Sequence, residues 1–287
     1  LCSYSTALIA SQVPKNQSGY ALGTLSTGTV AGTLMGPLLG GLIAEQFGMR
    51  NVFLLVGFFL FLVSVLTWWG IEEDYQQISK EEHLSSWTLL ASIQHKDILL
   101  GLFLTSMTIQ MIGQSISPIL PLYVRELGQS DNVIFVSGLI VSAMGISSIL
   151  TSGWMGKLGD KIGNHRLLLL ALLYSGILYI FCALAQTPFQ LGFLRFLFGI
   201  GTGALMPGVT ALLNRMTPKE GISRIFSYNQ LFFYIGGVLG PMMGSSIAMH
   251  VNYHWVFYGT AILAFIDLAF LLFIFRKYLK VREISAH

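Results

Sequence analysis

The stretch Gly28–Gly41 reads GTVAGTLMGPLLGG and lies inside an apolar segment that spans residues 20–44. Its glycines recur at every fourth position: Gly28, Gly32, Gly36 and Gly40. Because four residues advance an α-helix by about 400°, these glycines form one nearly straight ridge without side chains. Helices in lipid attract one another largely through the close packing of small residues. The ridge therefore predicts a face at which this helix contacts another helix.

Pro37 interrupts the same helix, and Gly41 directly follows the ridge. Proline removes an amide donor and bends or weakens a helix, a defect that neighbouring helices in a membrane bundle accommodate. We therefore predict a kinked membrane helix with a glycine contact face. A tightly packed helix without any further role is the alternative interpretation.

The composition is that of an integral membrane protein. Apolar residues make up 54% of the 287 residues and charged residues only 10%, whereas soluble domains contain about 25% charged residues. The mean hydropathy is +0.69. The sequence contains no GxSxG, HExxH or P-loop motif and no pair of catalytic acids, which argues against an enzyme and against direct use of ATP. We predict no catalytic residue, no metal, no cofactor and no nucleic-acid partner.

Eight membrane spans are predicted, since about 20 apolar residues cross a bilayer. Besides residues 20–44, the predicted spans are 51–71, 98–124, 133–153, 167–185, 189–214, 222–250 and 253–275. A charged segment separates the first two spans from the other six. We therefore expect three parts: the remainder of an N-terminal helix bundle at 1–71, a linker at 72–97 and a C-terminal six-helix bundle at 98–287.

The lysines and arginines predict the orientation in the membrane. When the connectors alternate sides, Arg50 and Arg125 lie on one side, Arg195 lies within a span, and all the others of the 16 basic residues lie on the opposite side. The side richer in basic residues faces the cytoplasm. We therefore predict a multi-pass protein of the cell membrane whose linker and C-terminus are cytoplasmic.

The ridge occurs twice in the sequence. A shift of 204 positions places Gly32, Gly36, Pro37 and Gly40 on Gly236, Gly240, Pro241 and Gly244. Duplicated halves are typical of secondary transporters, whose binding site lies between the repeats. If the first half held as many helices as the second, about four more helices would be expected, most of them before Leu1.

The two copies resemble a signature of the drug:proton antiporter branch of the major facilitator superfamily. GTLMGPLLGG, from Gly32, is similar to the antiporter motif of the fifth helix, and GGVLGPMMGS, from Gly236, stands where the eleventh helix would be. The chain as a whole resembles multidrug efflux pumps of Gram-positive bacteria. The resemblance implies an all-α membrane protein with the twelve-helix major facilitator fold. This chain would then hold helices five to twelve, eight transmembrane helices, together with the end of helix four.

Residues 156–166 read GKLGDKIGNHR and resemble the superfamily's cytoplasmic loop motif. The residues of this predicted gate loop are Gly156, Asp160, Lys161, Gly163 and Arg166, whereas Asn164 stands where a basic residue is usual. The resemblance implies a charge clamp in which Asp160 pairs with Lys161, Arg166 or an adjacent helix terminus and holds the cytoplasmic gate shut. An ordinary basic loop that sets the topology is the alternative.

Two ionisable residues lie inside predicted spans, where burial is costly and a functional role is the default hypothesis. Arg195 lies in a stretch that resembles the second-half copy of the arginine motif of helix four, which the family links to proton movement. Because Arg195 is in the duplicate and near a span end, structural pairing or snorkelling is the alternative. Asp267 lies near the middle of the last span, where it is either a proton-coupling carboxylate or a helix-packing acid.

Uncharged polar residues beside methionines and aromatic residues mark two spans as cavity candidates. These candidates are Met107, Gln110, Met111, Gln114, Asn229, Gln230, Phe233 and Tyr234. Thioethers and rings adapt their packing, and aromatic faces attract cations, so this set suits a loose site for small amphipathic or cationic drugs. Hydrogen bonding between helices is the alternative role for each amide side chain.

These features predict a proton-coupled multidrug efflux transporter that works by alternating access, with the proton gradient as its energy source. Its partners would be the lipid bilayer, drug-like substrates and protons, and the family leads us to expect a monomer. Two alternatives stay open. One is uptake or export of a sugar or other metabolite by the same fold, and the other is a truncated fragment that does not transport.

Overall fold

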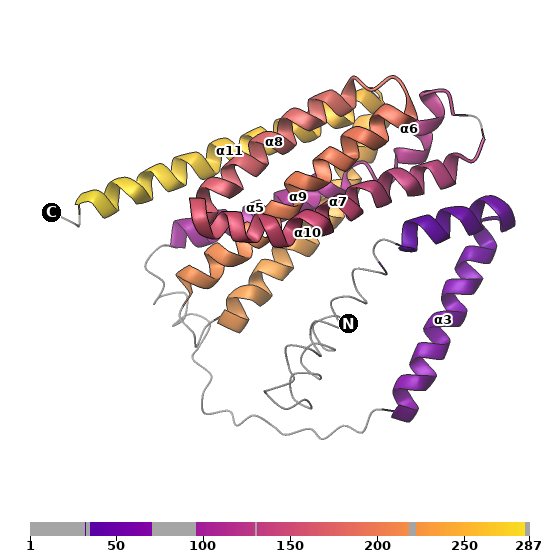
Figure 1. The fold of residues 1–287 in the computed structure, drawn as a ribbon, viewed down its shortest axis with the longest axis horizontal. Helices are drawn as coiled ribbons and strands as arrows, with labels where there is room; N and C mark the ends of the chain where they lie inside the picture. The colour runs from indigo at the N-terminus through magenta and orange to yellow at the C-terminus, as the bar shows by residue number, and fades with distance from the viewer. Residues whose placement is uncertain (1–31, 33–34, 71–95, 130, 218–221, 285–287) are drawn as a thin grey trace.

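The computed structural model describes residues 32, 35–70, 96–129, 131–217 and 222–284, and all regular structure in these residues is helical. Gly28, the expected end of helix four and most of the predicted linker lie outside them. Residues 35–47 form a helix. It is followed by α3 (Met49–Gly70), α5 (Lys96–Gln114), α6 (Leu120–Glu126), α7 (Val133–Ile162), α8 (Asn164–Ala183), α9 (Pro188–Met216), α10 (Ile222–His250) and α11 (Tyr253–Ile284). Figure 1 shows α5 and α7–α11 gathered into one bundle.

Seven helices of the described part are long and apolar enough to cross a membrane, namely α3, α5 and α7 to α11. They correspond to seven of the eight predicted spans, so the prediction of an all-α membrane protein is confirmed. The first predicted span, at 20–44, falls mostly outside the described residues.

The span predicted at 98–124 is not one continuous helix. The chain leaves the helical conformation after Gln114 and enters α6 at Leu120. Pro118 lies between them, and proline both lacks an amide hydrogen and disfavours helical geometry in the residue before it. The prediction of an uninterrupted helix was wrong here because it followed hydropathy and gave this proline too little weight.

The predicted loop at 156–166 is also largely helical. The helix α7 continues beyond the predicted end at Gly153 as far as Ile162. Gly163 then makes the turn with φ +96°, a conformation that favours glycine, and α8 begins at the next residue. The motif therefore forms the last turns of one helix, a tight turn and the first turn of the next.

Helix starts differ in how they are capped. The Thr187 side chain accepts a hydrogen bond from the amide of Gln190 at the start of α9 (3.2 Å), and the Asn252 side chain does the same for Trp255 in α11 (3.1 Å). In contrast, Asn132 before α7 has φ +54° and makes no side-chain cap, and the first turn of α7 contains no acidic residue. The N-terminus of α7 therefore lacks a cap of its own.

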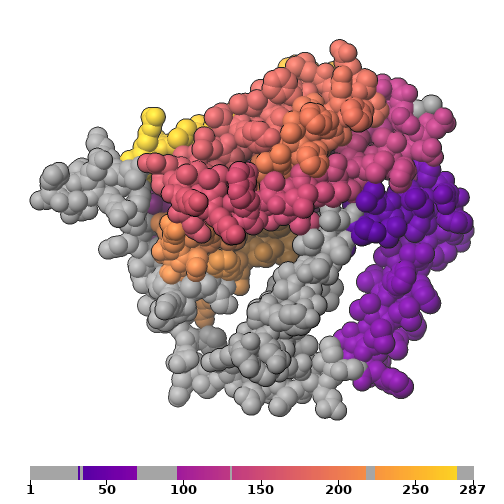
Figure 2. Space-filling model, viewed as in Figure 1, coloured from indigo at the N-terminus to yellow at the C-terminus, as the bar shows by residue number. Residues whose placement is uncertain are grey.

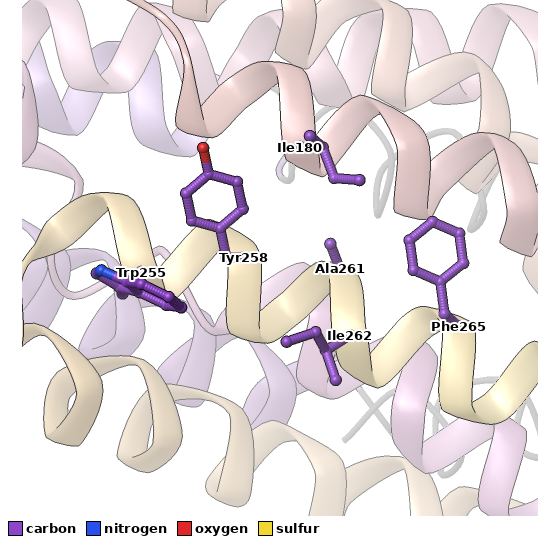
Figure 3. Close-up of a pocket in the computed structure, with 6 residues that line it drawn as sticks. All are labelled: Ile180, Trp255, Tyr258, Ala261, Ile262 and Phe265. Carbon is purple, nitrogen blue, oxygen red and sulfur yellow. The ribbon is translucent and has the colours of Figure 1, made fainter.

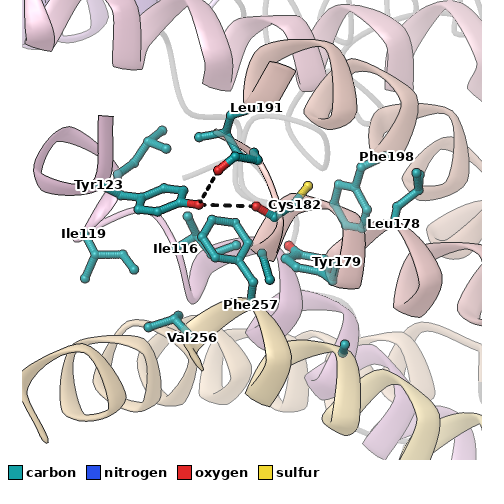
Figure 4. Close-up of a cluster of buried hydrophobic side chains, with 14 of the residues drawn as sticks. Ile116, Ile119, Tyr123, Leu178, Tyr179, Cys182, Leu191, Phe198, Val256 and Phe257 are labelled. Atoms are coloured by element: carbon teal, nitrogen blue, oxygen red, sulfur yellow. Dashed lines mark hydrogen bonds between the residues drawn. The ribbon is translucent and has the colours of Figure 1, made fainter. Parts of the chain in front are cut away.

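Glycines allow α9 to approach α7 closely. A Cβ added at Gly203 would lie 2.7 Å from the Ser148 carbonyl oxygen, and one at Gly199 would overlap the Met144 carbonyl oxygen. Such distances leave no room for a side chain, so the two helices pack backbone against backbone. Two apolar clusters complete the packing, and one of them joins α6 to the neighbouring helices around Tyr123 (Figure 4).

The helix α3 stands apart from the bundle in Figure 2. No part of its membrane-length window is buried, although its mean hydropathy is 2.4. A helix that is apolar on all sides is typical of a membrane span, where lipid or other helices surround it. Its exposed apolar surface therefore agrees with the predicted membrane location.

Candidate functional site

The second copy of the ridge packs directly on α5. Each glycine faces one backbone carbonyl group: Gly236 faces Met107, Gly240 faces Met111, and Gly244 faces Ser115, the residue that directly follows α5. A Cβ added at Gly240 would lie 2.7 Å from the Met111 carbonyl oxygen. The spacing of four residues on both helices keeps the contact in register along two turns. We call this contact, defined by these six residues, the α5–α10 seam.

Two neighbouring hydroxyl groups connect α5 to two different helices. Ser106 donates a hydrogen bond to the side-chain oxygen of Asn229 in α10 (2.6 Å), and Thr105 donates to Oδ1 of Asp267 in α11 (3.0 Å). All four side chains are buried. The helix α5 is therefore held to α10 and α11 by polar contacts as well as by packing. Sequence reasoning did not single out Thr105, because one hydroxyl in an apolar span carries no distinctive pattern.

The predicted cavity residues lie along the two helices of the α5–α10 seam. Six of them are half-buried: Met107, Gln110, Met111, Gln114, Gln230 and Phe233. Asn229 is buried in its hydrogen bond to Ser106, and Tyr234 is 60% exposed. The structure thus brings these candidates from two distant parts of the sequence onto adjoining helices. Their role in binding stays a prediction.

Asp267 is buried with one carboxylate oxygen unpaired. Its side chain is 5% exposed, Oδ1 accepts the bond from Thr105, and Oδ2 has no hydrogen-bond partner. A carboxylate in a membrane span that lacks a cationic partner is costly when ionised. Its surroundings can therefore accommodate a proton on Oδ2.

Arg195 is fully buried, so the suggestion that it snorkels to the membrane surface was wrong. It is 1% exposed, donates a hydrogen bond from Nη1 to the Tyr179 hydroxyl (3.1 Å) and lies 5.8 Å from the centre of the Phe198 ring. Tyr179 in turn donates to the carbonyl oxygen of Ile112 (2.6 Å). Figure 4 shows Tyr179 and Phe198 within the buried cluster. Arg195 thus joins α9, α8 and the last turn of α5, which is a packing arrangement.

The predicted clamp residue Asp160 forms an ion pair with Arg215. The distance is 3.5 Å, and both side chains are largely exposed. Arg215 lies in the last turn of α9, and sequence reasoning did not name it as a partner. One sequence signal could have identified this partner: Arg215 directly follows a predicted span, and a basic residue is favoured at a helix C-terminus. The ion pair connects the end of α7 to the end of α9.

The helix at 35–47 contacts the start of α7. A Cβ added at Gly138 would overlap the Pro37 carbonyl oxygen, and one added at Gly41 would lie 3.1 Å from the Ile134 carbonyl oxygen. Glu45 Oε2 accepts a hydrogen bond from the Ile134 amide (3.3 Å). This contact joins the first predicted part of the chain, 1–71, to the C-terminal bundle.

Two apolar cavities are lined by described residues alone, and none of the predicted cavity residues lines either of these two. One, of about 260 Å³, lies between α8 and α11 (Figure 3), and the other, of about 280 Å³, lies among α7, α8 and α9. The first is lined by Ile180, Trp255, Tyr258, Ala261, Ile262 and Phe265. Within the same described residues, no cluster of side chains suits a metal ion.

Comparison with known proteins agrees with this architecture. The family model described as Major Facilitator Superfamily matches residues 3–137 and 98–286. The multi-drug resistance efflux pump PmrA of Streptococcus pneumoniae is 61% identical over 280 residues, which cover 98% of this chain and 70% of that protein. A PmrA homolog of Lactococcus lactis is 50% identical over 281 residues, covering 98% and 69%.

A more distant relative and a solved structure with the same fold are also similar to this chain. The multidrug resistance protein MdtG of Salmonella arizonae is 47% identical over 258 residues, covering 90% of this chain and 64% of that protein. A solved structure of a bacterial homolog of the human lysosomal transporter Spinster, inward-facing and unoccupied, superposes with a TM-score of 0.77 at 17% identity, covering 96% of this chain and 74% of that one. The chain therefore belongs to the Major Facilitator Superfamily, a family of membrane transporters rather than enzymes.

Proposed function

We propose that this protein exports drugs of several chemical types in exchange for protons, by alternating access. The observation that carries the proposal is the 61% identity, over 98% of this chain, to a protein named as a multi-drug resistance efflux pump. A second relative with a similar name matches the same share of the chain at 50% identity.

In this proposal, two halves rock about a site near the middle of the membrane. The half-buried amide, methionine and aromatic side chains of α5 and α10 would contact the substrate, as predicted from the sequence. The close α5–α10 seam would prevent leakage through the C-terminal half. The Asp160–Arg215 ion pair (3.5 Å) joins α7 and α9 within the C-terminal half, so it would stabilise the cytoplasmic end of that half. The proton gradient would supply the energy without any cofactor.

The test of the proposed function is dye efflux in cells that lack their own drug pumps. Cells that express the protein are loaded with ethidium, and the loss of fluorescence is followed with and without a protonophore. We expect efflux that the protonophore abolishes. Efflux no faster than in empty-vector cells would contradict drug export, and efflux that resists the protonophore would contradict proton coupling. Accumulation or loss of a labelled sugar in place of ethidium would support the metabolite alternative.

Asp267 is the proton-coupling candidate that we favour, because its Oδ2 atom is buried and unpaired and a carboxylate can gain and lose a proton. Arg195 also has a buried unpaired atom, Nε, but a guanidinium stays protonated. We expect Asp267→Asn, which keeps the shape and removes the titrating group, to abolish proton-driven efflux while the protein still folds. Thr105→Val serves as a control, since it removes the hydrogen bond but leaves the carboxylate. If Asp267→Asn transports normally, Asp267 is a packing residue.

The proposed orientation places the linker and the C-terminus in the cytoplasm, and we expect a monomer in the membrane. Single cysteines at Ser79 in the linker and at Asp131 before α7 test the orientation, with both native cysteines replaced. An impermeant maleimide added to intact cells should label the cysteine at position 131 and not the one at 79. The reverse pattern would overturn the orientation.

A further inference from the structure

The N-terminus of α7 is capped by a residue from another part of the chain. The first amides of a helix have no partner within the helix and need acceptors from elsewhere. The residue before α7 provides no side-chain cap, and its first turn contains no acid. Glu45 lies 89 positions away in sequence and accepts the bond from the Ile134 amide. A carboxylate at this position also interacts favourably with the helix dipole.

The backbone around Glu45 supports this contact independently of the hydrogen bond. Each of the two helices contributes one glycine to the contact: Gly41 faces the Ile134 carbonyl group of α7, and Gly138 of α7 faces the Pro37 carbonyl group. Gly48, with φ +82°, ends the helix at 35–47 just after Glu45. The close approach and the sharp helix end together place the carboxylate against the start of α7.

The contact has no counterpart in the second copy of the repeat. The shift of 204 positions places Glu45 on Met249 at the end of α10, and Met249 is 77% exposed. A methionine cannot cap a helix N-terminus. The acidic cap is therefore a feature of one copy only, and the pattern shared by both copies does not require it.

We propose that Glu45 is a latch that holds the first part of the chain against α7 at the outer face of the membrane. The orientation and the alternating-access cycle proposed above are the basis for placing this contact outside. When the two halves separate on that side, the bond between Glu45 and the Ile134 amide breaks and the α7 N-terminus is left without an acidic cap. Glu45 thereby favours the state that is closed to the outside.

The experiment measures the distance across the contact by double electron–electron resonance. Spin labels are attached at Phe53 in α3 and Leu139 in α7, both exposed, in a protein whose native cysteines are replaced. We expect Glu45→Ala to change the two populations in the distance distribution. The ratio of molecules at the long distance to molecules at the short distance should rise roughly two- to fivefold, which is the effect of losing one exposed helix cap. Glu45→Gln should have a smaller effect, because its amide oxygen still accepts a hydrogen bond. An unchanged distance distribution in Glu45→Ala would overturn the latch.

A second variant separates a latch from a simple helix cap. Val133→Glu gives α7 an acid of its own in the first turn. Combined with Glu45→Ala, it should restore thermal stability but leave the long distances in place, because the new acid does not bind the other part of the chain. Recovery of the short distances would contradict the proposal. Gln46→Ala, at the adjacent exposed position, is the matched control and should change neither quantity.

The outcome is independent of drug export. The distances are measured without any drug, so a protein that responds to Glu45→Ala but fails to export ethidium contradicts the proposed function and supports the latch. A protein that exports ethidium but shows no response contradicts the latch alone.

Discussion

The two glycine ridges share a sequence pattern but differ in what they contact. In α10, Gly236, Gly240 and Gly244 lie against the backbone of α5. In the first ridge, a Cβ added at Gly32, or at Gly36 or Gly40 in the helix at 35–47, would meet no atom of the described residues within 4 Å. The contact of that helix with α7 instead uses Gly41, one position beside the ridge. The pattern thus identifies a face that permits close approach, and the surrounding fold determines which helix occupies it.

The repeat suggests what the first ridge contacts. In the second copy the partner is α5, and the shift of 204 positions assigns no residue of this sequence as the counterpart of α5. We predict that the first ridge also packs against a helix in the working transporter. The following predictions test whether the two ridges are equivalent.

The largest effect is expected for Gly244→Leu. The glycine faces the Ser115 carbonyl group so closely that any side chain would displace backbone. Overpacking typically costs about 1–3 kcal/mol and occasionally more, and we expect this site at the upper end because backbone must move. We expect a large loss of folded protein, measured as the monodisperse fraction in detergent and its apparent melting temperature. Gly57→Leu in α3, where an added Cβ meets nothing within 4 Å, is the control. Equal behaviour of the two variants would show that the α5–α10 seam is not tightly packed.

Gly36→Leu should lower ethidium efflux at least tenfold, provided that the first ridge needs close contact with a helix during transport. The described residues leave space at this position, so any loss of function must arise from a partner outside them. The measurement is protonophore-sensitive efflux normalised to the amount of protein in the membrane. Transport at the original rate would show that the first ridge is not a contact face and that the two copies are not equivalent.

A smaller effect is expected for Gly138→Ala, which places a methyl group against the Pro37 carbonyl oxygen. The two helices must move apart, so cross-linking between cysteines introduced at Phe53 and Leu139 should decrease by several-fold. Gly113→Ala in α5, where an added Cβ has open space, should leave cross-linking unchanged. Unchanged cross-linking in Gly138→Ala would mean that this contact does not hold the helix at 35–47 in place.

Sequence reasoning predicted the helical membrane class, seven of the described spans and the duplicated ridge, because hydropathy and glycine spacing are local patterns. It placed the C-terminal ends of α5 and α7 incorrectly. Each end is set by one turn of the chain, at Pro118 and at Gly163, and hydropathy does not detect such a turn. It could not predict the partners of Asp160, Arg195 and Asp267. These are Arg215, Tyr179 and Thr105, which lie 55, 16 and 162 positions away. Such pairs depend on how helices pack, and no spacing in the sequence encodes them.

The smallest effect is expected for the hydrogen bond between Ser106 and Asn229 (2.6 Å) in the second ridge's contact. Hydrogen bonds between membrane helices contribute about 0.6 kcal/mol on average. A double-mutant cycle with Ser106→Ala and Asn229→Ala, measured by reversible unfolding in mixed micelles, should give a coupling energy of about that size. The glycine contacts would then account for most of the attraction between α5 and α10. A coupling energy above about 2 kcal/mol would mean that the polar pair dominates the contact. The first ridge has no such pair among the described residues. It would then be the weaker contact face of the two.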